Sequence, residues 1–115
     1  MEAWSFPPAY DDAYMPDPAS PYWFPQRETM RPAERDAAIV VRLREGMRYA
    51  YATSPVYRKK WDEAGIDPES IDSLEAFERV PVVTKAELRA SQALAPPFGE
   101  YLCVPEEEVH HIHGT

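Results

Sequence analysis

The chain has 115 residues and a formal net charge of −8, with 44% hydrophobic and 28% charged residues. This composition excludes a chain that is disordered throughout, and the length allows no more than one domain of ordinary size. The longest aliphatic run, at residues 37–41, is too short to cross a bilayer, and the acidic start does not resemble an export signal. We therefore expect a cytoplasmic protein with no membrane partner.

Residues 1–28 form an arm rich in proline and aromatic side chains. The arm contains six prolines and seven aromatic residues, a mixture that regular helices and strands do not accommodate. We expect the arm to be partly disordered, mainly over about its first 15 residues. Residues 20–25 are expected to lie across a folded body, because each aromatic side chain can bury a large apolar area.

From Pro32 onward the spacing of apolar residues becomes helical. Apolar side chains recur along one face at Ile39, Val40, Leu43, Met47, Ala50 and Tyr51. Ser54 and Pro55 are the N-cap and first residue of a second helix, so the first helix ends just before them. Gly65 supplies the left-handed residue that closes the second helix.

Two shorter helices follow in the sequence. The first lies near residues 73–79 and presents Phe77, and the second opens with Thr84 and Glu87, whose spacing is that of a capping box. Residues 29–99 are therefore predicted to form a cap of three or four helices.

Residues 100–115 are predicted to contain two short strands. β-forming side chains make up residues 101–104, and an acidic turn at residues 106–108 leads into a final apolar and histidine-rich segment. The predicted fold class is an α+β fragment, with the helices first and the two strands last, as the first part of a larger α/β fold. Because two strands alone are marginal, we expect a partner to complete them.

Histidine and cysteine residues near the end of the chain raise the question of a metal or catalytic site. On a strand, His111 and His113 would share one face and supply two ligands, whereas a closed site needs three or four. Only the carboxylates of residues 106–108 lie nearby, and they are interpreted as a solvated turn. Cys103 has no adjacent activating partner and is interpreted as an apolar thiol. The sequence thus predicts no metal ligands and no catalytic residues.

A basic segment lies between two acidic ones. The net charges are −4 for residues 1–30, +5 for residues 31–60 and −9 for residues 61–115. A basic segment can contact a polyanion, but the sequence has no RNA- or DNA-binding motif. We interpret the basic segment as a solvated helix face and predict no nucleic-acid partner.

Several separated pieces of the sequence resemble one known family. These pieces are Tyr49-Ala50, Ser54-Pro55 with Tyr57, Ala64-Gly65-Ile66, Ser73-Leu74, Pro81 with Thr84-Lys85 and Leu88, Pro97-Phe98-Gly99, Val104-Pro105 and Ile112-His113. In this order, over residues 22–115, they resemble the N-terminal segment of the phenylacetate–coenzyme A ligases, which are adenylate-forming enzymes of the AMP-dependent synthetase/ligase superfamily. His111 departs from the pattern, in which arginine is common, and the arm before Tyr22 is outside it.

The resemblance implies an AMP-forming acid–thiol ligase of aromatic acid degradation. Such an enzyme activates a carboxylic acid with ATP and magnesium to an acyl-adenylate, and then transfers the acyl group to coenzyme A. The resemblance implies that Gly114 and Thr115 begin the phosphate-binding loop and so contribute to cofactor binding. The implied partners are the catalytic body and the C-terminal domain of the ligase, with a homodimer as one assembly of the full enzyme. We do not expect the 115-residue piece alone to be active or to bind these cofactors tightly.

Two alternatives to a ligase fragment stay open at this point. The chain could be a stand-alone interaction module, or the small subunit of a split ligase that has lost the catalytic body. The acid is also open among phenylacetate, a hydroxybenzoate and other aryl acids.

Overall fold

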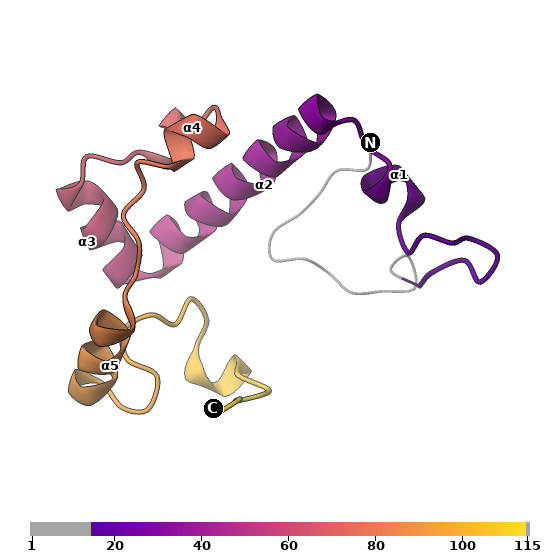
Figure 1. Cartoon of the computed structure of the whole chain (residues 1–115). Coiled ribbons are helices and arrows are strands. Elements are labelled where there is room, and N and C mark those ends of the chain that lie inside the picture. The colour runs from indigo at the N-terminus through magenta and orange to yellow at the C-terminus, as the bar shows by residue number, and fades with distance from the viewer. Residues whose placement is uncertain (1–14, 115) are drawn as a thin grey trace.

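The computed structural model describes residues 15–114, which are largely helical (Figure 1). The elements are α1 (Pro25–Glu28), α2 (Pro32–Thr53), α3 (Pro55–Glu63), η2 (Pro68–Ser70), α4 (Leu74–Phe77), α5 (Lys85–Leu94) and η3 (Glu106–Glu108). The long helix α2 has α3 and α4 beside it, while α1 lies at its N-terminal end and α5 lies beyond α3. The expected disorder at the start of the arm concerns residues outside the described part.

The boundary between α2 and α3 lies where the sequence predicts it. Pro55 occupies the first turn of α3, and the hydroxyl of Ser54 accepts a hydrogen bond from the backbone N–H of Tyr57 at 3.5 Å. After α3, Gly65 adopts a φ of +66°, which a glycine adopts without strain. The N-cap and the glycine turn of the second predicted helix are therefore confirmed.

Side-chain caps also set the start of the two later helices. Ser73 Oγ accepts from the N–H of Ala76 at 3.1 Å at the start of α4. At the start of α5, Thr84 Oγ1 accepts from the N–H of Glu87 at 3.2 Å, and the Glu87 carboxylate accepts from the N–H of Thr84 at 2.7 Å. The predicted capping box is thus present, and α5 continues to Leu94.

A small apolar core holds α3 and α4 against α2. Its buried members, from α2, α3, α4 and the segment after η2, are Met47, Trp61, Ile71 and Ala76. The Trp61 ring lies 5.4 Å from the Tyr57 ring and 6.4 Å from the Tyr51 ring, between centroids. These aromatic contacts make the junction of α2 and α3 the best-packed part of the described chain.

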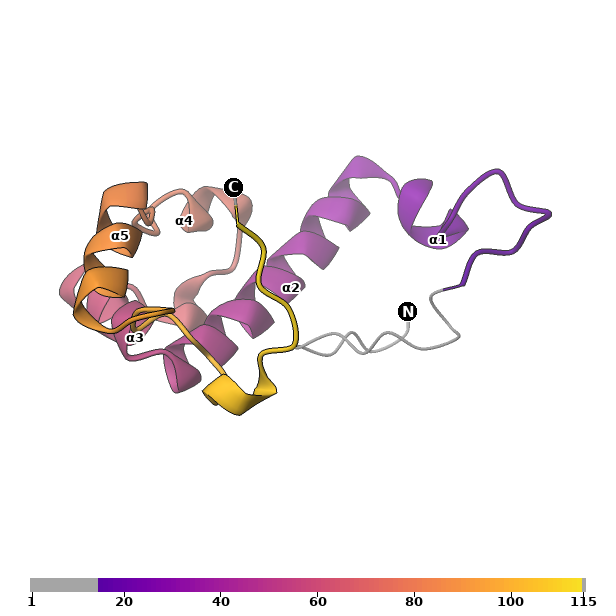
Figure 2. The same cartoon turned by 90° about the horizontal axis from the view of Figure 1, so that it is seen from below.

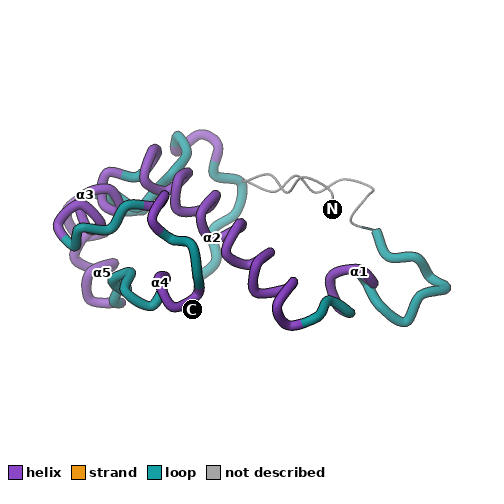
Figure 3. Tube along the Cα trace, turned by 90° about the horizontal axis from the view of Figure 1, so that it is seen from above, coloured by secondary structure: helices purple, strands orange, loops and turns teal. Residues whose placement is uncertain are grey.

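The prediction of two strands is wrong for the part of residues 100–115 that the structure describes. Residues 100–114 consist of loops and the single turn η3, and no strand occurs in residues 15–114, as the helix and loop colours of Figure 3 show. The physical reason is that a strand obtains its hydrogen bonds from a neighbouring strand, which these residues do not have beside them. β-forming side chains favour an extended backbone but do not supply that neighbour. The described part is therefore helical, not α+β.

The arm also departs from the sequence expectation at one place. Residues Pro25–Glu28 form the single-turn helix α1, with Pro25 in its first turn, where a missing N–H does no harm. Just before α1, the Tyr22 and Trp23 side chains are 44% and 57% exposed. The expectation that residues 20–25 cover a folded body stays a prediction.

None of the helices described between residues 15 and 114 is long and apolar enough to cross a membrane.

Candidate functional site

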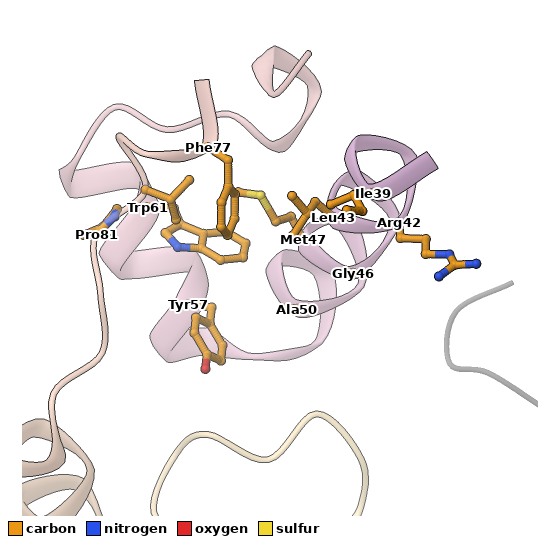
Figure 4. Close-up of a pocket in the computed structure, with 11 residues that line it drawn as sticks. Ile39, Arg42, Leu43, Gly46, Met47, Ala50, Tyr57, Trp61, Phe77 and Pro81 are labelled. Atoms are coloured by element: carbon orange, nitrogen blue, oxygen red, sulfur yellow. The ribbon is translucent and has the colours of Figure 1, made fainter. Parts of the chain in front are cut away.

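An apolar groove opens between α2, α3 and the segment that contains α4. Its volume is about 540 Å³. The groove is lined by Ile39, Arg42, Leu43, Gly46, Met47, Ala50, Tyr57, Trp61, Phe77, Val80 and Pro81. In Figure 4 the side chains of Met47, Trp61 and Phe77 meet at its floor, and the guanidinium of Arg42 points away from them. The groove therefore offers an almost wholly apolar surface.

The predicted apolar stripe of the first helix forms one wall of this groove. Ile39, Leu43, Met47 and Ala50 all line it, so the helical spacing of these four residues is confirmed. Met47 is buried, whereas Ile39 and Leu43 are only half-buried. The outer part of the stripe is thus open, in contrast to the part that contacts α3.

The segment after α5 is fixed to the junction of α2 and α3 by two tyrosines. The hydroxyl of Tyr49 donates a hydrogen bond to the carbonyl of Cys103 at 3.1 Å. The Tyr57 ring meets the Tyr101 ring edge-on, with centroids 5.5 Å apart and planes at 82°. Burial raises the pKa of the Tyr57 hydroxyl, and the nearby Tyr101 and Cys103 add to this effect. These contacts hold residues 101–103 in place.

Ser91 and Gly99 determine how the chain leaves α5. The hydroxyl of Ser91, which is buried, accepts a hydrogen bond from the N–H of Glu100 at 2.9 Å. Gly99 has a φ of +71°, and a Cβ there would lie 2.7 Å from Ser91 Oγ. Only glycine fits this close approach, because any side chain would meet both the backbone strain and the hydroxyl.

Gly114, which the family resemblance implies to be the start of a phosphate-binding loop, lies at the exposed end of this segment. No atom lies within 4 Å of a Cβ built on Gly114, and no hydrogen bond within the described chain holds residues 110–114. Thr115 lies outside the described residues. A phosphate site needs several converging N–H groups and cations, which the described residues do not gather around Gly114. They do not by themselves fit ATP or magnesium, so the role of both residues stays a prediction.

The rings of His111 and His113 lie side by side, although the strand predicted for them is absent from the described residues. The rings of His111 and His113 are 6.4 Å apart between centroids and inclined by 13°. Among residues 15–114 no group of three or more histidine, cysteine, aspartate or glutamate side chains could hold a metal ion. The Cys103 thiol is half-buried, and its Sγ lies 3.8 Å from the carbonyl of Tyr101.

Several cations of the basic segment have partners within the chain. Arg48 pairs with Glu45 and Glu69, which links α2 to η2 and lowers the pKa of Glu69. Lys60 pairs with Glu87, which links α3 to α5; together with the hydrogen bonds from Thr84, this lowers the pKa of Glu87 to about 2. The interpretation as a merely solvated face therefore needs correction at Arg48 and Lys60.

The guanidinium of Arg58, also in the basic segment, binds the C-terminal end of α2. It donates to the carbonyls of Tyr51 and Ala52 at 2.9 and 2.7 Å, at the C-terminal end of α2. A cation at this position complements the unpaired carbonyls and the negative end of the helix. No local sequence pattern predicts this contact, because Arg58 belongs to the next helix.

Comparison with known proteins shows similarity to parts of longer proteins. No protein-family model matches the chain. Phenylacetate-coenzyme A ligase of Thermus thermophilus is 36% identical over 91 residues, which are 79% of this chain and 19% of that protein. The Escherichia coli protein of the same name is 34% identical over 88 residues, covering 76% of this chain and 19% of the relative.

Solved structures give a second, independent similarity. A crystal structure of 2-hydroxyisobutyryl-CoA ligase, in the postadenylation state with 2-HIB-AMP, superposes with a TM-score of 0.89 and 57% sequence identity. This match covers 100% of our chain and 24% of the ligase. The same ligase in complex with 2-HIB-AMP and CoA in the thioesterification state also matches, with a TM-score of 0.89. The chain thus spans about a fifth to a quarter of the length of these proteins.

Proposed function

Because the chain corresponds to the N-terminal segment of the phenylacetate-coenzyme A ligases, within the adenylate-forming superfamily, we propose that it is part of an acid–coenzyme A ligase. The complete enzyme joins a carboxylic acid to the AMP part of ATP with release of pyrophosphate, and the thiol of coenzyme A then displaces AMP to form the acyl thioester. The cytoplasm as the site of action, magnesium as the metal and the remainder of the ligase as the partner belong to this proposal.

One observation carries the proposal more than any other. The match to 2-hydroxyisobutyryl-CoA ligase extends over the whole chain at 57% identity, and that ligase has been crystallised with an acyl-adenylate and with CoA. A TM-score of 0.89 over the whole chain means that its overall arrangement closely resembles that of the matching segment in the ligase. This similarity supports a similar role of residues 101–114 in leading the chain toward the active site.

The described residues contribute position, not chemistry, to this reaction. Tyr49 and Tyr57 fix residues 101–103, and Ser91 with Gly99 fixes the exit from α5. Both attachments lie before Gly114 in the chain. We propose that they hold the segment that delivers Gly114 and Thr115 to the phosphate-binding loop, while the atoms that bind ATP belong to the rest of the ligase.

The acid substrate has two candidates. The relatives named phenylacetate-coenzyme A ligase support an aryl acid, as the sequence resemblance implies. The higher identity to 2-hydroxyisobutyryl-CoA ligase, 57% against 36%, favours a small hydroxy acid as the second candidate. The groove described above does not choose between them, because nothing in the comparisons places an acid in it.

A chimeric ligase tests the proposal directly. In 2-hydroxyisobutyryl-CoA ligase, this chain replaces the matching segment, and pyrophosphate release is measured with 2-hydroxyisobutyrate and with phenylacetate. We expect acid-dependent release from the chimera and none from the 115-residue chain alone. A chimera that folds with native helix content but releases no pyrophosphate would contradict the proposal. Release by the isolated chain would contradict the view that it lacks the active site.

A further inference from the structure

We propose that the apolar groove between α2, α3 and α4 is the docking surface for the remainder of the ligase, and that its occupant is the apolar face of an amphipathic helix C-terminal to residue 115. This inference rests on the proposed function, because it names the partner of the same segment. It goes further by assigning the contact to particular side chains.

The groove is deeper than a surface of scattered apolar residues. Met47, Trp61 and Phe77 meet at its floor, where Met47 and Trp61 are each 5% exposed (Figure 4). Ile39 and Leu43 lie along one wall and are half-buried. A volume of about 540 Å³ accommodates large side chains rather than a few water molecules. Apolar side chains gathered in one groove gain free energy when another apolar surface covers them and removes them from water.

The other described elements leave the open side of the groove uncovered. Residues 101–103 contact the N-terminal part of α3 through the Tyr57–Tyr101 ring contact, α5 is linked to α3 by the Lys60–Glu87 pair, and α1 lies beyond the N-terminal end of α2 (Figures 1 and 2). None of the residues that line the groove comes from α1, α5 or residues 101–103. The occupant must therefore come from outside residues 15–114.

The walls of the groove determine what kind of occupant fits. Its residues lie on the helices α2, α3 and α4 or follow α4, and the backbone groups inside a helix are already hydrogen-bonded. A groove between helices thus binds through side chains, as an amphipathic helix does in an apolar groove, and not by adding a strand.

The length of the relatives identifies the source of the occupant. The matched segment is 24% of 2-hydroxyisobutyryl-CoA ligase, so about three quarters of that ligase lies outside it. The matched segment superposes with a TM-score of 0.89, so we expect the groove to face the rest of the protein there as well. The remainder of the ligase is tethered to the groove, which gives it a high effective concentration over any separate partner.

A photo-crosslinking amino acid placed at Leu43 tests this assignment. The experiment uses the full-length chimera described above and, as a reference, 2-hydroxyisobutyryl-CoA ligase with the same amino acid at the matching position. Val41 provides the matched control, since it lies on the same helix, is 53% exposed and does not line the groove. We expect at least a tenfold higher crosslink yield at Leu43 than at Val41, with the product mapped by mass spectrometry to a segment after residue 115.

The other outcomes overturn the inference. A crosslink from Leu43 to residues 1–14 would assign the groove to the arm, and an intermolecular crosslink would assign it to a second copy. Equal yields at Leu43 and Val41 would mean that the groove is empty. If the chimera does not fold, the reference ligase decides between the same outcomes.

A pair of substitutions separates this inference from the proposed function. Leu43→Asp in the chimera is expected to lower the midpoint of thermal unfolding by several degrees more than Val41→Asp, because it places a charge against the occupant. If the chimera releases pyrophosphate but both variants unfold alike, the docking surface is wrong and the proposed function stands. If the crosslink forms as expected but no pyrophosphate is released, the docking surface stands and the proposed function fails.

Discussion

The helices of residues 32–94 and the loops of residues 100–114 differ in how many of their contacts lie within the described chain. A helix forms its backbone hydrogen bonds within itself, and α2 and α3 in addition bury Met47 and Trp61 against each other. Residues 110–114 have no hydrogen bonds within the described chain, and Ile112 is 73% exposed. The described residues therefore contain one region that is held by its own contacts and one that makes few contacts of its own.

The largest expected effect is a substitution in the core of the first region. Trp61→Ala removes a side chain that is 5% exposed and leaves a cavity between α2, α3 and α4, at a cost of about 3–5 kcal/mol in the free energy of unfolding. Urea unfolding followed by far-UV circular dichroism measures it. Ile112→Ala, in the second region, is expected to change nothing. Equal effects of both substitutions would remove the distinction between the regions.

Two glycines sharpen the comparison where the regions meet. Gly99→Ala is expected to destabilise the chain more than Gly65→Ala. Both residues have a positive φ, and holding an alanine in this left-handed conformation costs about 1–2 kcal/mol. Only at Gly99 would the added Cβ also lie 2.7 Å from Ser91 Oγ. The free energies of unfolding in urea provide the measurement. Equal losses would mean that the contact with Ser91 does not hold the exit of α5.

A cap substitution tests how far the first region depends on local signals. Thr84→Ala removes the hydroxyl that accepts from the N–H of Glu87, and it is expected to cost about 1 kcal/mol. Thr84→Ser, which keeps the hydroxyl, is the control and should recover most of the loss. Helix content and urea unfolding report the result, and an unchanged Thr84→Ala variant would show that packing alone sets the start of α5.

The smallest expected effect is a pH dependence that arises from Glu87. The pKa of this carboxyl is lowered from 4.5 to about 2, first by its hydrogen bond with Lys60 and then by those with Thr84. Ionised Glu87 therefore stabilises the fold above about pH 4.5, and this contribution is lost as the pH falls toward 2. Glu87→Gln should show a weaker loss of stability over this interval in thermal melts.

Lys60→Gln serves as the matched variant for the pH measurement. It removes the main cause of the lowered pKa and should reduce the acid dependence in the same direction as Glu87→Gln. Identical pH profiles for the wild-type chain and both variants would show that this pair does not link α3 to α5.

Much of the helical region follows from short sequence signals. Ser54 with Pro55, Ser73, and Thr84 with Glu87 mark helix starts because each cap acts within three residues of its own position. The spacing of Ile39, Leu43, Met47 and Ala50 gives the apolar face in the same way. These signals are local, so the rest of the protein is not needed to interpret them.

The long-range contacts could not be predicted from the sequence. Nothing in the pattern pairs Tyr49 with the carbonyl of Cys103, 54 positions later, or Arg58 with the end of the preceding helix. The prediction of strands is wrong for a related reason. The residue types at residues 101–104 indicate a preference for extended backbone, whereas a strand also needs a neighbouring strand, which this pattern does not predict. The proposed role of Gly114 likewise depends on residues outside the described chain.

Hydrogen exchange at residues 109–113 tests the central claim most directly. Amide exchange is measured by mass spectrometry in the 115-residue chain and in the full-length chimera, with the amides of α2 as internal reference. Free exchange of residues 109–113 in the isolated chain and strong protection in the chimera, with little change in the middle of α2, is the predicted result. Equal exchange of residues 109–113 in both proteins, or strong protection in the isolated monomer, would contradict the claim that this segment is completed by the remainder of a ligase.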